Sequence, residues 1–208
     1  MSPKPLLVWT MMALVWLTSG CEKPPEELRD LGALPTFSFR TEQGRPLTDQ
    51  TLRGKPWVAN FLFTSCPTSC PPLAEATAKL QARIAPWRGE GGPRIVSFTV
   101  DPVTDTPEVL RTFARRYGAD PKIWSFARAD WEATEALVTR GFLQPLLRKD
   151  LPPGTPPIHV ADKPTPFDTA HGLRFVLVDG GGTMRALYDK DDASLERLER
   201  ALRWLHEH

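Results

Sequence analysis

The chain has 208 residues, of which 41% are apolar and 25% charged, so its length and composition predict one globular domain with one core. It carries 26 Lys and Arg against 25 Asp and Glu, and this balance argues against a nucleic-acid-binding protein, which usually has a basic excess. Three cysteines are too few for the disulfide framework of a small secreted domain.

The first 20 residues have the layout of a secretory signal. Lys4 supplies a positive charge, residues 6–17 are almost wholly apolar, and residues 18–20 are small. The apolar run is shorter than the roughly 20 residues that a membrane-spanning helix needs. We therefore expect residues 1–20 to be a signal peptide that exports the domain to the outer, periplasmic side of the inner membrane.

Cys21 follows this segment directly, as the lipidated cysteine of a bacterial lipoprotein follows its signal. The lipoprotein pattern usually has Leu three residues before the cysteine, and here that residue is Thr18. A plain cleaved signal and an uncleaved short anchor are the alternatives. We expect Cys21 to be lipidated, residues 21–35 to form a charged, proline-bearing tether to the membrane, and residues 36–208 to form the domain.

The first half of the domain alternates predicted strands and helices. A hairpin is expected within residues 36–48. Residues 57–63 are a nearly continuous apolar run, which is typical of a strand covered on both faces. Apolar residues then repeat at helical spacing over residues 73–84, and Pro86 ends that helix. Residues 95–100 predict a second buried strand.

The alternation continues after residue 100. Thr106 followed by Pro107 is typical of a helix start. Up to a stop at Gly118, four residues are expected to form one apolar face: Val109, Leu110, Phe113 and Tyr117. A short strand is predicted over residues 124–127, and Asp130 can cap a helix over residues 131–140.

The last part of the chain begins with an irregular segment, residues 144–169, which has seven prolines and little periodicity. A loop of this length in a compact domain is usually functional or mobile. A strand over residues 173–178, a tight glycine turn, a strand over residues 183–188 and an amphipathic helix over residues 195–205 follow. The order predicts an α/β fold with a central mixed sheet flanked by helices, in the thioredoxin arrangement.

Cys66 and Cys70 lie just after the first central strand, at the start of the following helix. Residues four apart face the same side of a helix, so both sulfurs are expected to point to one spot near the carboxyl ends of the strands. A helix N-terminus favours thiolate over thiol. Two thiolates suit Cu(I), zinc or a reversible disulfide, and an inert disulfide is the plain alternative. The absence of a second cysteine pair argues against a zinc ribbon.

His171 precedes the strand over residues 173–178. In a thioredoxin-like fold the start of this strand lies beside the cysteine loop, so the imidazole is a candidate third ligand, although a lone histidine is more often an ordinary loop residue. Thioredoxin-type redox sites usually have two residues between their cysteines, whereas residues 67–69 supply three here. That spacing and the histidine favour metal binding over redox chemistry.

Three motifs in order resemble the Sco/SenC family of copper proteins, and the resemblance covers residues 35–208. Residues 63–71, FTSCPTSCP, resemble the family pattern F-T-x-C-P-x-x-C-P. Residues 101–107, DPVTDTP, resemble its D-P-x-x-D-T-P segment. His171, ahead of a strand that ends in VDG at residues 178–180, resembles the third motif.

This resemblance implies a membrane-tethered, thioredoxin-like domain that binds copper, as Cu(I) and Cu(II), with Cys66, Cys70 and His171 as ligands. It implies a metallochaperone, not an enzyme, that helps assemble the binuclear copper centre of cytochrome c oxidase. The partners would be the copper-site subunit of that oxidase and a copper donor protein. The alternative function is a thiol–disulfide reductase, in which Cys66 and Cys70 keep the recipient's cysteines reduced for metal loading.

Other polar residues near these motifs are given plainer interpretations. Ala170 occupies a position that is acidic in many members of the family, so an acidic neighbour of His171 is not expected from that position. Asp101 and Asp105 are interpreted as loop caps, and His159 as a solvated loop residue.

Overall fold

The computed structural model describes residues 23–87, 91–144, 146 and 174–208. The predicted signal peptide, Cys21, nearly all of the proline-rich segment and His171 lie outside the described residues. None of the helices in the described part of the chain combines the length and the apolar character that a membrane crossing requires.

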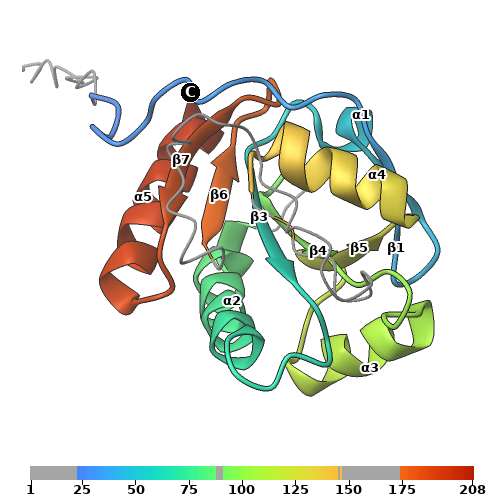
Figure 1. Ribbon diagram of the computed structural model, residues 1–208. Helices are drawn as coiled ribbons and strands as arrows, with labels where there is room; N and C mark the ends of the chain where they lie inside the picture. The colour runs from blue at the N-terminus through green and yellow to red at the C-terminus, as the bar shows by residue number, and fades with distance from the viewer. Residues whose placement is uncertain (1–22, 88–90, 145, 147–173) are drawn as a thin grey trace, which may run out of the picture.

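A seven-stranded mixed sheet, with strand order β2-β1-β5-β4-β3-β6-β7, forms the centre of the molecule (Figure 1). The strands β3, β4 and β5 are parallel, and the others pair antiparallel. The strands are β1 (Ser38–Thr41), β2 (Pro46–Thr48), β3 (Trp57–Leu62), β4 (Arg94–Thr99), β5 (Trp124–Arg128), β6 (Phe175–Val178) and β7 (Met184–Tyr188). This confirms the predicted mixed sheet and its closing hairpin.

Helices cover both faces of the sheet. One face packs against α2 (Cys70–Ile84), α3 (Pro107–Arg116) and α5 (Asp192–Glu207). The helix α4 (Trp131–Glu135) and its continuation η2 (Ala136–Gly141) pack on the other, where the short α1 (Asp49–Leu52) also lies. A single 3-10 turn, η1 (Ala85–Trp87), extends α2. The central strands have apolar side chains on both faces, and this arrangement buries both sets.

The central strand β3 explains why two layers are needed. All six of its residues are buried. Val58 and Leu62 belong to the core beneath α2 and α5, whereas Trp57 and Phe61 belong to the core beneath α4. Such a strand cannot be stable with one face in water, because each large apolar side chain gains about 1.5–3 kcal/mol from burial. Its carboxyl end carries the cysteine loop.

The N-terminal segment lies along the outer edge of β7. The backbone N–H groups of Arg29, Leu31 and Leu34 donate to carbonyl oxygens of residues 182–185, at 2.8–2.9 Å. Leu34 is buried in the core on the α4 side. The residues predicted as a tether, 21–35, therefore include a part that packs on the sheet, and the packed domain begins before residue 36.

Several details differ from the sequence-based expectations. The helix α1 was not predicted, and its N-cap residue, Thr48, forms a capping box with Thr51. The helix expected over residues 131–140 changes from α to π geometry at Ala136. Val109 was expected on the buried face of α3 but is 36% exposed, because the face that meets the core is centred on Leu110. Asp130 does cap α4, accepting from the N–H of Ala133 at 2.8 Å.

Candidate thiol and metal site

Cys66 and Cys70 lie at the carboxyl end of β3. The chain leaves this strand at Leu62 and turns, with the N–H of Cys66 donating to the carbonyl of Phe63 at 3.2 Å. Cys70 is the first residue of α2, so only this cysteine is helical. The loop, and not a shared helical face, therefore brings the two residues together, which corrects the geometry expected from their spacing.

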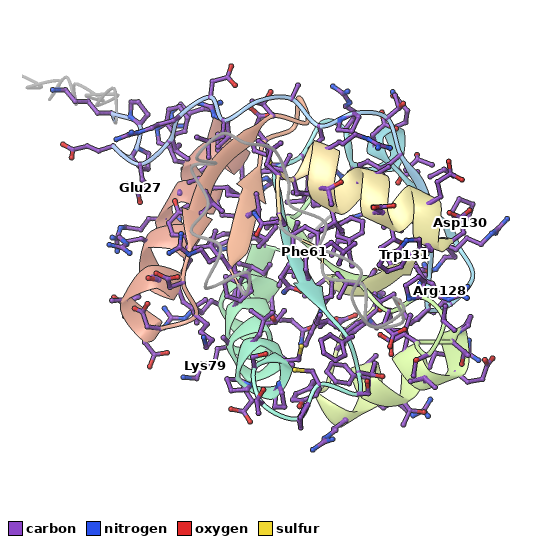
Figure 2. All side chains as sticks on the ribbon, in the orientation of Figure 1. Glu27, Phe61, Lys79, Arg128, Asp130 and Trp131 are labelled. Carbon is purple, nitrogen blue, oxygen red and sulfur yellow. The ribbon has the colours of Figure 1, made fainter. Side chains whose placement is uncertain are left out.

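The sulfur of Cys66 is held at the N-terminal end of α2. It accepts a hydrogen bond from the N–H of Cys70 at 3.4 Å, and the hydroxyl of Ser69 lies 3.3 Å away. Ser69 is the N-cap residue of α2, but its side chain makes no capping hydrogen bond to the backbone. Sulfur atoms, yellow in Figure 2, lie beside the start of α2. The N-terminal end of the helix therefore stabilises negative charge on the Cys66 sulfur, as helix N-termini do for phosphates and other anions.

The two thiols differ strongly in acidity. Burial alone would raise the pKa of Cys66, but hydrogen bonds from Ser69 and from the backbone of Thr68 and Cys70 outweigh it and lower the pKa to about 6. Burial raises the pKa of Cys70 to about 12, and the neighbouring Cys66 and Asp105 add to this effect. At neutral pH the pair is therefore one thiolate, Cys66, and one thiol, Cys70.

Both cysteines are free, and both are buried, with Cys66 8% and Cys70 1% exposed. A hydrogen bond with Cys66 also contributes to the raised pKa of the Cys70 thiol, so the two side chains lie close together. Two facing soft ligands with little access to water fit a soft monovalent ion such as Cu(I), and they equally fit reversible disulfide formation. The expectation that both sulfurs point to one spot is confirmed by this geometry.

A buried carboxylate, Asp105, lies beneath the cysteine loop. Its oxygens accept hydrogen bonds from the N–H and hydroxyl of Thr64 and from the hydroxyl of Thr99. Asp105 was interpreted as a loop cap and its proximity to the cysteines was missed. The sequence held a signal for it, since it follows the carboxyl end of the strand that pairs with β3, and the ends of parallel strands meet at one edge.

The structure does not describe the other predicted site residues. Cys21, His159 and His171 lie outside the described residues, as do the predicted loop and signal. Among the residues that the structure does describe, no group of three or more His, Cys, Asp and Glu side chains is arranged to hold a metal ion. The described part of the site therefore consists of two cysteine sulfurs with a buried carboxylate nearby.

Comparisons with known proteins agree with this architecture. Residues 27–207 match the family model described as SCO1/SenC. A 90-residue segment, 43% of this chain, is 36% identical to the SCO1 protein homolog of Bacillus subtilis (strain 168). That segment spans 46% of the relative, so the chain matches about half of its length.

Solved structures extend the similarity to most of the chain. The crystal structure of a SCO1/SenC family lipoprotein from Bacillus anthracis is 30% identical, with a TM-score of 0.67 over 83% of this chain and 94% of that one. BsSco, 22% identical, has a TM-score of 0.69 over 88% and 98% of the two chains and shares the fold. Because the family model spans nearly the whole domain, the chain belongs to the SCO1/SenC family.

Proposed function

We propose that this protein is a copper metallochaperone, which holds the ion on Cys66 and Cys70 and helps assemble the binuclear copper centre of cytochrome c oxidase. The observation that carries the proposal is the pair of free, facing cysteines at the start of α2 in a member of this family. BsSco is described as a member of the Sco family of cytochrome c oxidase assembly proteins. The structure of Arabidopsis thaliana ScoI, with the same fold, has copper bound.

The two oxidation states of copper are expected to use different sets of ligands. Cu(I) is satisfied by two soft sulfurs, whereas Cu(II) prefers an additional imidazole nitrogen in a tetragonal arrangement. We assign that third ligand to His171, which precedes β6, the strand that pairs with β3. On this assignment the cysteines bind copper in both states and the histidine is specific to Cu(II).

The place of action follows from the N-terminal sequence. We propose export across the inner membrane on residues 1–20 and lipid anchoring at Cys21, which would keep the domain on the periplasmic side. The similar Bacillus anthracis protein is a lipoprotein. The partners there would be a copper donor protein and the copper-site subunit of the oxidase, and no nucleic acid.

Copper titration of the reduced, full-length protein tests the proposal. We expect one copper per chain, read by metal analysis, with a thiolate-to-Cu(II) charge-transfer band. Cys66→Ser or Cys70→Ser should abolish binding of both states, because one sulfur does not hold the ion alone. His171→Ala should remove most Cu(II) affinity and alter Cu(I) affinity little. A wild-type protein that binds no copper would overturn the proposal, and unchanged Cu(II) binding by His171→Ala would exclude the three-ligand site.

The acidity difference favours a second function, a thiol–disulfide reductase. The Cys66 thiolate would attack a disulfide of the recipient and release one of its sulfurs as a thiolate. Cys70 would then lose its proton and attack the Cys66 sulfur, which leaves the recipient reduced and a Cys66–Cys70 disulfide in this chain. A model disulfide reduced as fast by His171→Ala as by wild type, in protein that binds no copper, would favour this function.

A further inference from the structure

Asp105 is the most deeply buried carboxylate near the site, with a side chain that is 0% exposed. The N–H of Thr64 lies 3.2 and 3.3 Å from its two oxygens, and the hydroxyl of Thr64 donates to the same carboxylate. The hydroxyl of Thr99 accepts from the N–H of Asp101 at 3.0 Å, so its own proton is free to donate to Asp105. Burial raises the pKa of Asp105, and the hydrogen bonds from Thr64 and Thr99 act in the opposite direction, because three donors stabilise the ionised carboxylate.

Within the described ranges, the charge of this carboxylate has no opposite charge in an ion pair with it. None of the ion pairs between described residues includes Asp105. Its hydrogen-bond partners are the neutral hydroxyls and amide already named, and the nearby carboxylate of Asp101 carries a charge of the same sign. In a buried environment an uncompensated charge acts over longer distances than it would in water, because less solvent screens it.

The cysteine site is within reach of that charge. Thr64, which donates to the carboxylate, precedes Cys66 by two residues, and two extended residues span at most about 7 Å. Burial and the neighbouring Cys66 raise the pKa of the Cys70 thiol, and the charge of Asp105 adds to this effect, as expected at such a separation. Asp105 is therefore a buried carboxylate close enough to act electrostatically on the sulfur pair.

We propose that Asp105 is a positioning residue of the cysteine site whose negative charge makes the site hold Cu(II) more tightly, relative to Cu(I), than the sulfurs would alone. The proposal rests on the proposed copper function. Bound Cu(II) carries one more positive charge than bound Cu(I), so a fixed negative charge nearby stabilises the divalent state more. The hydrogen bonds from Thr64 connect the carboxylate to the cysteine loop.

The variant Asp105→Asn keeps the shape of the side chain and removes its charge. At an effective dielectric constant of about 20, a unit charge roughly 10 Å away changes the ratio of the two copper affinities about tenfold. We expect Asp105→Asn to shift the ratio of Cu(II) to Cu(I) dissociation constants about tenfold toward Cu(I), which for this one-electron couple is a rise of about 59 mV in potential. The full chain is titrated with each ion against competing chelators.

Two further measurements separate charge from structure. Thr99→Val removes a hydrogen bond to the carboxylate but keeps the charge, so its affinity ratio should stay within about twofold of wild type. In metal-free protein the reduced pair carries a thiolate and the disulfide does not. Asp105→Asn should therefore favour the reduced pair about tenfold, a rise of about 30 mV in the two-electron potential.

The outcomes are distinct. A shifted ratio and potential in Asp105→Asn, with neither shifted in Thr99→Val, supports the proposal. Equal shifts in both variants, or none in Asp105→Asn, overturn it. If Asp105→Asn does not fold, Asp105→Ser removes the same charge. If neither Asp105 variant folds while Thr99→Val does, Asp105 has only a structural role, and the proposal is overturned. If wild type binds no copper, the proposed function fails while the metal-free potential still tests Asp105.

Discussion

The acidity of Cys66 can be changed through one neighbouring hydroxyl. The Ser69 hydroxyl lies 3.3 Å from the Cys66 sulfur and stabilises its thiolate. A hydrogen bond to a charged group contributes about 1.5–3 kcal/mol, and one pKa unit corresponds to about 1.4 kcal/mol. Ser69→Ala should therefore raise the pKa of Cys66 from about 6 to about 7 or higher. Because the thiolate is the reactive form, the midpoint of alkylation against pH moves upward by the same amount.

The assay is alkylation by iodoacetamide from pH 4 to pH 10, with labelled peptides quantified by mass spectrometry so that Cys66 and Cys70 are followed separately. Wild-type Cys66 should titrate near pH 6, and Cys70 should stay unreactive until strongly alkaline pH. Ser65→Ala is the matched control, since this exposed hydroxyl in the same loop makes no described bond to the sulfur. An unchanged midpoint in Ser69→Ala, or a wild-type midpoint near the ordinary 9.0, would refute the reasoning.

Three other substitutions test separate parts of the chain. Cys21→Ser should move the protein out of the membrane fraction or block its maturation, and an unlipidated wild-type N-terminus found by mass spectrometry would contradict this. Gly180→Ala would place a Cβ 2.9 Å from the backbone nitrogen of Lys55 and should lower the free energy of unfolding in urea by about 1–3 kcal/mol. If Gly180→Ala is as stable as wild type, the turn at residue 180 can shift to make room for the Cβ. Asp130→Ala removes the cap of α4 and should cost about 1 kcal/mol in the same assay, and an effect below the error would mean that solvent replaces the cap.

The sheet and the long helices were predictable because their signals are periodic. The apolar run over residues 57–63 matches β3 within one residue, and the Thr106 cap marks the start of α3. The helix α1 is only four residues long, too short to show a helical repeat. The π geometry of η2 changes the register of the backbone hydrogen bonds without requiring a particular side chain, so no sequence pattern predicts it.

The cysteine pair was predictable from spacing, but the way it is held was not. The Ser69 hydroxyl and the Cys70 N–H act on Cys66 through the turn of the loop, which depends on tertiary packing. Asp105 lies 39 positions beyond Cys66 in the chain, so only the pairing of β3 with β4 brings them close. The packing of residues 29–34 on β7 was not predicted for a related reason. The backbone of these residues pairs with β7, and backbone pairing needs no apolar side-chain pattern.

The packing of the N-terminal segment on β7 fixes the position of the thiols relative to the point where the chain enters the domain. Residues 29–34 run along β7, and the chain leaves the sheet at the top of Figure 1, whereas the start of α2 with the cysteines lies at the bottom. The packed segment also prevents the domain from swinging freely about residue 35. A membrane attachment ahead of residue 23 would therefore join the domain at the end opposite to the thiols. Soluble proteins could then approach the site from the aqueous side, and a membrane-embedded recipient would have to extend its own domain toward it.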